Sequence, residues 1–242
     1  MVKFFIKPTR FKTNRGEKAQ ELICKQTDNM IIDKDFSKKL ALKLLKINAV
    51  ILRPDEPFRW SSGWYSPIYC DNRLTMRYPK LRAEIAEYIT GYIKNKYATA
   101  DVITGTATAG IPHAAWVAER LDKPMVYVRG KAKTHGTTSQ IEGRINKGES
   151  SVVIEDLIST GESAISAAKV LEFVGAEVLG IISIFTYGFD HAKEKFEQNG
   201  LELATLTDYE TLITIALENG FVKEENLELL NQWRMTPETW PD

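Results

Sequence analysis

Residues 152–163 read VVIEDLISTGES and join an apolar run to an acidic pair and a small, hydroxyl-rich turn. Residues 152–155 have the apolar content of a buried strand, and residues 163–174 favour a helix. In open α/β sheets, ligands bind beyond the carboxyl ends of the strands. The segment therefore predicts a binding site at Glu155 and Asp156, where a strand ends and a helix follows.

Strand-like and helix-like segments alternate along most of the chain. Segments at 101–104, 125–128, 152–155, 178–185 and near 203 favour strands, and residues 49–52 form a further short apolar run. Helices are favoured at 36–47, 78–97, 111–121, 163–174 and 191–198, with others from 208 and 223. Residues 58–73, FRWSSGWYSPIYCDNR, are rich in aromatic and turn-forming residues and predict a hairpin-like loop. The alternation predicts an α/β fold with a parallel sheet covered by helices on both faces.

The chain is long enough to bury one sizeable core, since it has 242 residues and 43% hydrophobic content. Residues 1–33 mix basic and polar residues with short apolar groups. We interpret them as an N-terminal extension of unknown role. Residues 34–242 carry the regular pattern and are expected to form the main domain.

The composition argues against several classes of protein. Lys plus Arg and Asp plus Glu each number 32, so the net charge is +0 and lacks the basic excess of general nucleic-acid-binding proteins. Cys24 and Cys70 have no metal-ligand spacing and form no disulfide framework, which favours a reducing compartment. The first apolar run stops at Ile6, too early for a signal peptide, and no stretch approaches the roughly 20 apolar residues that span a bilayer. We therefore expect a cytoplasmic protein without a membrane partner.

The acidic pair and the turn at residues 159–161 have complementary chemistry. The turn leads into a helix, whose N-terminus offers unpaired backbone N–H groups and a partial positive charge to a phosphate. Gly161 would let the backbone approach that anion closely because it has no Cβ. Carboxylates beside a phosphate make sense if they accept hydrogen bonds from hydroxyl groups or hold a metal. A sugar phosphate would satisfy both parts of the segment.

The turn at residues 159–161 also has a simpler interpretation, and two other nucleotide-binding motifs do not match the sequence. Ser, Thr and Glu begin many helices, so the turn could be an ordinary helix cap. A P-loop requires Gly-Lys-Ser/Thr, and the sequence contains no such triplet. Residues 105–110, GTATAG, form a second small-residue turn without the glycine spacing of the dinucleotide-binding motif, and a simple strand-to-helix loop explains them equally well.

The segment at 152–163 resembles the motif that binds phosphoribosyl diphosphate (PRPP) in type I phosphoribosyltransferases. In that family the acidic pair contacts the ribose hydroxyls and the turn binds the 5′-phosphate. The resemblance implies a parallel sheet flanked by helices, a small hood subdomain with the N-terminal part of the chain, and a flexible lid loop. It also implies a catalytic role for Asp156. The implied PRPP contacts are Glu155, Asp156, Leu157, Ile158, Ser159, Thr160, Gly161, Glu162 and Ser163.

The polar segment at about 129–148 is the expected lid. It is long for a connection inside a compact domain and carries several cations and glycines, although a solvated loop has a similar composition. It resembles the catalytic loop of the orotate phosphoribosyltransferases, which closes over the neighbouring subunit's active site in a homodimer. The resemblance implies PRPP contacts for Arg129, Lys131, Lys133 and His135, and catalytic roles for Lys133 and His135. Many family members have Lys where this chain has Gly130, so Lys131 is the candidate for that role.

Residues 58–73 resemble the orotate loop of the same family through their Ser-Gly, Ser-Pro and aromatic pattern. An aromatic-rich structural hairpin is the alternative interpretation. By the match, Tyr69 and Cys70 stand where family aromatics pack near the base. Ser61 stands where some members have a diphosphate-binding Lys, so this chain departs from that pattern.

The partner of the base carboxylate is the least defined part of the expected site. Many orotate enzymes have an Arg after the strand that follows the PRPP motif, but residues 183–190, SIFTYGFD, contain none. Tyr187 lies near the matching position and joins Ser159, Tyr69 and Cys70 as a predicted orotate contact. Ser159, loop backbone N–H groups and Arg73 all stay open as partners of the carboxylate itself.

The implied reaction transfers the ribose 5-phosphate group of PRPP to orotate, which gives orotidine 5′-monophosphate and diphosphate in pyrimidine biosynthesis. The implied cofactor is Mg²⁺, carried by PRPP or diphosphate rather than by a dedicated protein site. Two alternatives stay open. One is a phosphoribosyltransferase for another base, and the other is a PRPP-sensing regulator of the same fold that transfers little or nothing.

We expect Lys133→Ala to lower turnover about 10²- to 10³-fold, because a lid cation stabilises the charge that builds on the departing diphosphate. Steady-state rates with PRPP, orotate and Mg²⁺ would measure the loss. A melting curve followed by circular dichroism would show that the variant is folded. A turnover close to that of the wild type would contradict the role of the lid.

Overall fold

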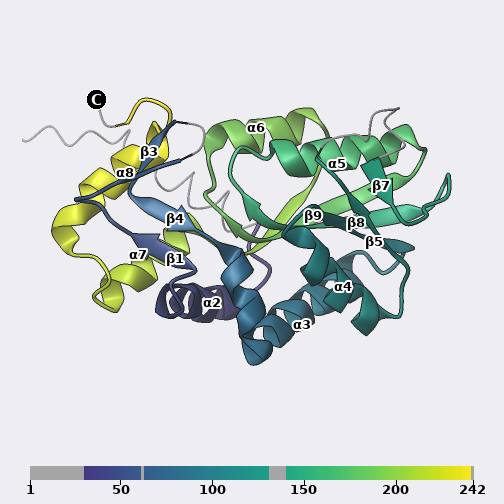
Figure 1. Cartoon of the computed structure of the whole chain (residues 1–242), viewed down its shortest axis with the longest axis horizontal. Helices are drawn as coiled ribbons and strands as arrows, with labels where there is room; N and C mark the ends of the chain where they lie inside the picture. Colours follow the sequence, from purple (N-terminus) through teal and green to yellow (C-terminus); the bar gives the residue numbers. More distant parts are fainter. Residues whose placement is uncertain (1–29, 61–62, 131–139, 241–242) are drawn as a thin grey trace, which may run out of the picture. The chain divides into compact units, whose positions relative to one another are not determined.

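The computed structural model describes residues 30–60, 63–130 and 140–240 (Figure 1). The chain divides into two compact units, Met1–Met30 and Ile31–Asp242, and all the helices and strands below belong to the second. In the part of the chain that is described, no helix is both long and apolar enough to cross a membrane.

A six-stranded sheet forms the centre of this unit, in the strand order β10-β9-β8-β5-β6-β7. Neighbouring strands are parallel except for the antiparallel pair β6 and β7. The strands are β5 (Val102–Thr106), β6 (Met125–Val128), β7 (Ile141–Glu142), β8 (Ser150–Ile158), β9 (Glu177–Thr186) and β10 (Leu203–Asp208). The predicted α/β class with a mainly parallel sheet is confirmed.

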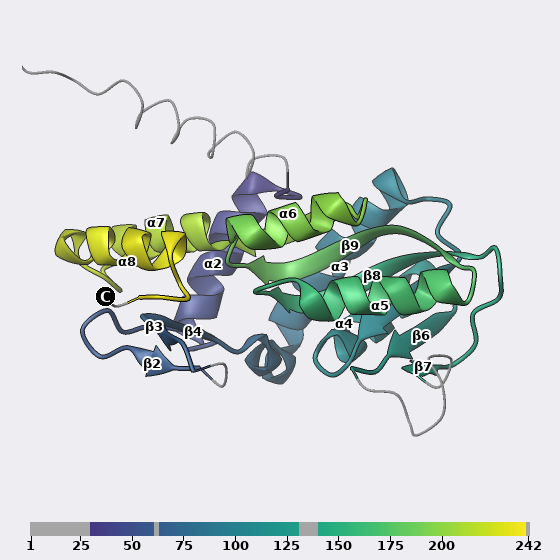
Figure 2. The same ribbon diagram turned by 90° about the horizontal axis from the view of Figure 1, so that it is seen from above.

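Helices cover both faces of the sheet, as Figures 1 and 2 show. On one face, α5 (Glu162–Phe173) and α6 (Asp190–Gln198) pack over a cluster that includes Val153 and Ile181. On the other face, the cluster includes Val152 and Ile154. Its helices are α2 (Lys34–Lys46), α3 (Pro79–Lys96) and α4 (Gly110–Leu121). Successive residues of β8 therefore enter opposite cores, which explains why residues 152–154 are apolar without a break rather than alternating.

A smaller group of elements gathers at one end of the unit, where both views place β3 and β4 beside α7 and α8 (Figures 1 and 2). β1 pairs with β4 and β2 pairs with β3, both antiparallel, so the predicted hairpin in residues 58–73 is confirmed. The bounds are β1 (Val50–Leu52), β2 (Phe58–Arg59), β3 (Tyr65–Ser66), β4 (Ile68–Cys70), α7 (Tyr209–Glu218) and α8 (Leu227–Met235), with short 3₁₀ helices at Asn72–Arg77 and Glu224–Asn226.

The strand that carries the acidic pair is longer than the sequence predicts. Residues 152–155 were expected as the strand, but β8 continues to Ile158. β5 pairs with β8 only as far as Gly105 opposite Ile154, whereas β9 follows β8 to Thr186 opposite Ile158. The acidic pair therefore lies inside the strand, in a section with a neighbour on one side only, and its predicted place at the strand end is wrong.

The turn at residues 105–110 brings α4 directly against this section of β8. A Cβ added to Gly110 would lie 2.4 Å from the Ile154 carbonyl oxygen, far inside van der Waals contact. Glycine is therefore needed at position 110 so that the N-terminus of α4 can lie against β8. A simple strand-to-helix loop, the other interpretation of residues 105–110, would not need it.

α4 also buries His113, which is only 1% exposed and has no hydrogen-bond partner for either ring nitrogen among the described residues. Burial lowers the pKa of His113 from 6.5 to about 4. An unfolded chain therefore binds the proton at a higher pH than the folded one. It follows that the folded state loses stability as the pH falls from about 6.5 to about 4, and loses no more below that.

We expect His113→Leu to remove this loss, which is on the order of 3 kcal/mol between pH 7 and pH 4. Urea unfolding of the wild type and the variant at a series of pH values would measure it. Carboxyl groups titrate in both proteins, so the difference in unfolding free energy isolates the histidine. A difference that stays constant with pH would contradict the burial of a neutral ring.

Candidate functional site

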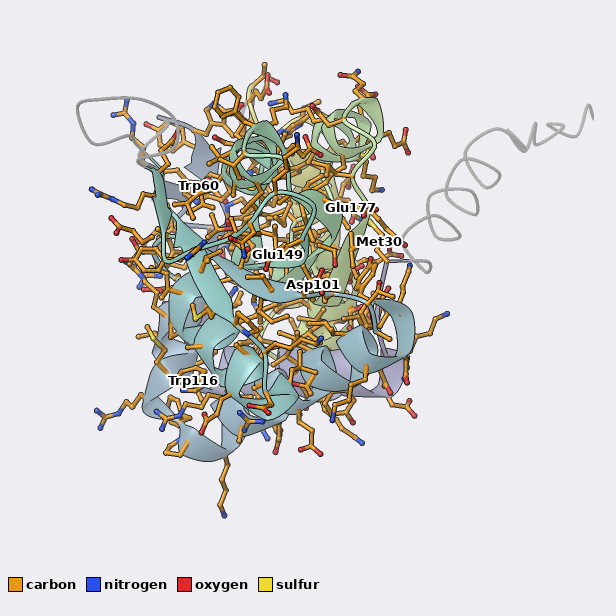
Figure 3. The ribbon with its side chains drawn as sticks, turned by 90° about the vertical axis from the view of Figure 1, so that its right-hand side faces the viewer. Met30, Trp60, Asp101, Trp116, Glu149 and Glu177 are labelled. Carbon is orange, nitrogen blue, oxygen red and sulfur yellow. The ribbon has the colours of Figure 1, made fainter. Side chains whose placement is uncertain are left out.

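The sheet reverses its strand order between β5 and β8. The chain passes from β5 to β6 on one side and later returns to β8 on the other side of β5. Such a reversal leaves a crevice at the carboxyl ends of the strands, and ligands bind there. The amino ends of the strands lie on the opposite side of the sheet from this crevice. Three acidic residues mark them, Asp101 at β5, Glu149 at β8 and Glu177 at β9 (Figure 3).

The acidic pair lies in this crevice and is largely buried. Glu155 is 5% exposed, and one of its carboxylate oxygens accepts a 3.1 Å hydrogen bond from the Asp156 N–H. The other oxygen has no partner among the described residues, and the nearby Thr106 hydroxyl has none either. Buried polar groups are normally paired, so unpaired ones suit a ligand that brings hydroxyl groups.

Burial changes the proton affinity of both carboxylates. It raises the pKa of Glu155 well above its usual value, and the negative charge of Asp156 raises it further. Burial also raises the pKa of Asp156. Asn72 fixes the backbone there by donating a 2.6 Å hydrogen bond to the Asp156 carbonyl. Perturbed carboxylates in a cleft are typical of functional sites.

The turn after β8 leads into α5 as expected. Gly161 has a positive φ of 78°, and a Cβ there would lie 2.7 Å from the Phe196 ring. Two features of the fold thus require glycine here: the positive φ, and the close contact with Phe196 of α6. Both hold independently of any role in anion binding. Glu162 begins α5, and its carboxylate binds Lys195 at 2.8 Å, so that side chain has a protein partner. Ile158 is 1% exposed and packs in the core instead of facing the crevice.

A small cavity of about 210 Å³ lies on one side of the turn, and we call it the polar cavity. It is lined by Thr106, Ala107, Val128, Arg129, Gly130, Glu162, Ser163, Ser166 and Ala167. Arg129 lines this cavity, and its guanidinium forms a 3.3 Å ion pair with Glu142. The cavity therefore joins the base of the predicted lid to the start of α5.

A larger cavity of about 490 Å³ lies between the turn and the hairpin, and we call it the aromatic cavity. It is lined by Arg59, Trp60, Trp64, Tyr69, Cys70, Leu157, Ser159, Thr160 and Tyr187. The four residues predicted to contact orotate, Ser159, Tyr69, Cys70 and Tyr187, thus come together from three distant parts of the sequence. Burial, followed by the charges of Asp156 and Asp71, raises the pKa of the Cys70 thiol, so this thiol stays protonated and serves as part of the wall.

A cluster of aromatic rings holds the aromatic cavity in shape. Tyr187 is only 2% exposed, and its ring centre lies 5.2 Å from that of Trp60 and 5.6 Å from that of Trp233. Trp233, on α8, also donates a 3.1 Å hydrogen bond from Nε1 to the Tyr65 carbonyl oxygen. Trp60 donates a similar bond of 3.2 Å to the Ile68 carbonyl oxygen. The C-terminal helix thereby fixes the hairpin that forms one wall of the cavity.

The structure shows which of the candidate residues line the aromatic cavity and which do not. Arg73 binds Asp71 through two hydrogen bonds of 2.6 and 2.8 Å and is not among the residues that line the aromatic cavity. Arg59, Trp60 and Trp64 do line it, and sequence reasoning missed their role. The predicted hairpin was the available signal, because its first strand lies beside the strand that follows the turn. Residues of the first strand can therefore line the same cavity as residues after the turn. The predicted residues Lys131, Lys133 and His135 lie outside the described residues.

Comparisons with known proteins agree with this geometry. A family model named phosphoribosyl transferase domain matches residues 77–208. An orotate phosphoribosyltransferase of Listeria monocytogenes serotype 4b is 55% identical over 205 residues, which cover 85% of this chain and 98% of the relative. The chain belongs to the orotate phosphoribosyltransferase family.

Solved structures of this kind have the same fold. The orotate phosphoribosyltransferase of Aeropyrum pernix gives a TM-score of 0.66 at 32% identity and covers 76% of this chain and 99% of its own. The Leishmania donovani UMP synthase gives a TM-score of 0.71 at 27% identity over 92% of this chain and 48% of its own.

Among the described residues, no group of three or more His, Cys, Asp or Glu side chains could hold a metal ion.

We expect Glu155→Gln to stabilise the fold at pH 7 by roughly 1 to 2 kcal/mol, or several degrees in Tm. A carboxyl group with a raised folded pKa costs stability as the pH rises above its unfolded value of about 4.5. The gain should therefore shrink as the pH approaches 4.5.

Thermal melts at pH 5 and pH 7 would measure this gain. Glu172→Gln, at an exposed position of α5, is the matched control and should change little at either pH. An unchanged or lower Tm for Glu155→Gln at pH 7 would show that burial of the acid does not cost stability.

Proposed function

We propose that this chain transfers the ribose 5-phosphate group of PRPP to orotate and releases diphosphate, as an enzyme of pyrimidine biosynthesis. One observation carries the proposal: a buried acidic pair with an unpaired oxygen lies beside Thr106, which lines the polar cavity, and directly before Leu157, which lines the aromatic cavity. A phosphorylated sugar suits the pair and the polar cavity, and a flat base suits the aromatic cavity. Relatives that are 55% identical and named orotate phosphoribosyltransferase support the same activity.

In the proposed complex, PRPP occupies the crevice. Glu155 and Asp156 accept hydrogen bonds from the ribose hydroxyls. The N–H groups of residues 159–163, at the start of α5, bind the 5′-phosphate, because a helix N-terminus favours an anion. Arg129, in the polar cavity, faces the diphosphate. Cationic or donor roles for Lys131, Lys133 and His135 rest on the resemblance of residues 129–148 to the family's lid.

The base enters the aromatic cavity. Tyr69, Cys70 and Tyr187 offer apolar walls, and the Ser159 hydroxyl offers a hydrogen bond near the turn that binds phosphate. In the proposed complex the ring nitrogen of the base faces the anomeric carbon of the ribose. The bond from that carbon to diphosphate breaks as the bond to nitrogen forms, and the nitrogen loses its proton.

Magnesium fits this site as a partner of the substrate. Mg²⁺ prefers oxygen ligands and is usually bound through one or two carboxylates together with substrate phosphates. The unpaired oxygen of Glu155 and the neighbouring Asp156 are the side chains that could take part. When bound, Mg²⁺ would neutralise charge on the diphosphate as it leaves.

The proposal extends to the assembly and the compartment. We propose a cytoplasmic homodimer in which residues 129–148 act as a lid over the partner's site, with residues 34–242 as the transferase domain and 1–33 as an extension. The support for this assembly is the family resemblance of the lid sequence.

The direct test is the loss of orotate absorbance in the ultraviolet, with PRPP and Mg²⁺ added together and each omitted in turn. We expect absorbance to fall only in the complete mixture, with one diphosphate released per orotate. Parallel reactions with uracil, adenine, guanine and hypoxanthine are the matched controls. PRPP binding without turnover of any base would favour the regulator, and turnover of another base in preference would move the assignment to that base.

A further inference from the structure

The aromatic cavity contains a single charged residue among the nine described residues that line it, and that residue is Arg59. The other eight are aromatic, aliphatic or uncharged polar residues, so the cavity suits a flat ring with one negative substituent. Orotate has that form, with a carboxylate on a pyrimidine ring. The inference below rests on the proposed function and concerns how its base is selected.

Arg59 has a guanidinium that is free to accept an anion. It is an exposed residue on β2, at the rim of the cavity, and its guanidinium lies 5.9 Å from the centre of the Tyr65 ring across the hairpin. No described residue forms an ion pair or hydrogen bond with that guanidinium. A planar guanidinium can bind a carboxylate through two parallel hydrogen bonds, which gives direction as well as attraction.

The nearby arginines are engaged elsewhere. Arg73 is held by Asp71 at 2.6 Å, and that pairing also lowers the pKa of Asp71. Arg53 lies 5.0 Å from the centre of the Phe58 ring and lines a different surface pocket, with Asp55 and Glu56. Neither of these arginines lines the aromatic cavity.

The structure also holds Arg59 in position. Its cross-strand partner in the hairpin is Tyr65, whose carbonyl oxygen accepts the hydrogen bond from Trp233. The next residue, Trp60, is fixed by its own hydrogen bond to Ile68 and by its contact with Tyr187. These contacts fix the backbone that carries Arg59, which lowers the cost of ordering the hairpin when a ligand binds.

We propose that the Arg59 guanidinium binds the carboxylate of the base and makes this chain selective for a carboxylated pyrimidine. It takes the role for which residues 183–190 offer no arginine. Arg59 is thus a specificity-determining residue, and it takes no part in bond breaking at the ribose.

The test compares the wild type with Arg59→Met, which keeps the length of the side chain and removes the charge, and Arg59→Lys, which keeps the charge. Arg53→Met is the matched control, a cation removed from the same region but from outside the cavity. For each protein, kcat and KM are measured for orotate and PRPP, with the inhibition constant of orotamide, the uncharged carboxamide analogue. Melting curves establish that each variant is folded.

For Arg59→Met we expect kcat/KM for orotate to fall about 10- to 100-fold, the usual loss for one hydrogen-bonded charged partner, with KM for PRPP nearly unchanged. The wild type should bind orotate more tightly than orotamide, and Arg59→Met should lose most of that preference. Arg59→Lys should recover part of it, and Arg53→Met should match the wild type.

Three results would overturn the inference while leaving the proposed function intact. They are normal orotate kinetics in Arg59→Met, an effect on PRPP alone, or equal losses for orotate and orotamide. A wild type that does not consume orotate with PRPP and Mg²⁺ would instead overturn the proposed function, and this inference with it.

Discussion

The unequal pairing of β8 is the constraint on which the rest of the site depends. The pairing of β5 with β8 ends at Gly105 opposite Ile154, whereas β9 pairs with β8 to its end. The section of β8 beyond Ile154 therefore has one open side, against which α4 begins at Gly110. Along this section the two adjacent carboxylates have no second neighbouring strand, and one oxygen of Glu155 has no partner among the described residues. With a strand on each side, the two carboxylates would be buried charges without partners.

A second set of contacts ties distant parts of the chain to the same crevice. Trp233, on α8, holds the hairpin through the Tyr65 carbonyl and packs against Tyr187, which directly follows β9. The wall of the aromatic cavity is thus built from three separate segments around one aromatic cluster. The same end of the unit also holds the unpaired oxygen of Glu155, a buried polar atom whose burial costs stability.

Much of the fold could be predicted because its periodic signals are strong. The segment at 163–174 gave α5 (Glu162–Phe173) within a residue, and the apolar run at 125–128 gave β6 as observed. The end of β8 was predicted wrongly because its last residues mix acidic and apolar types, and only the neighbouring strand β9 decides that they stay extended. The sequence left Ser159, loop N–H groups and Arg73 open as partners of the base carboxylate and did not include Arg59. The ion pair that holds Arg73 and the place of Arg59 beside the aromatic cavity exist only in the folded chain.

The sequence by itself determined the class of fold, the acidic pair and the small-residue turn, since these depend on residue type and short spacing along one strand and helix. Tertiary structure alone decided which side chains share a cavity, since Tyr69, Ser159 and Tyr187 meet only when the hairpin folds over the edge of the sheet. It also decided that the acids are buried and their pKa values raised. Burial and proximity are properties of the packed chain, and no short stretch of sequence contains them.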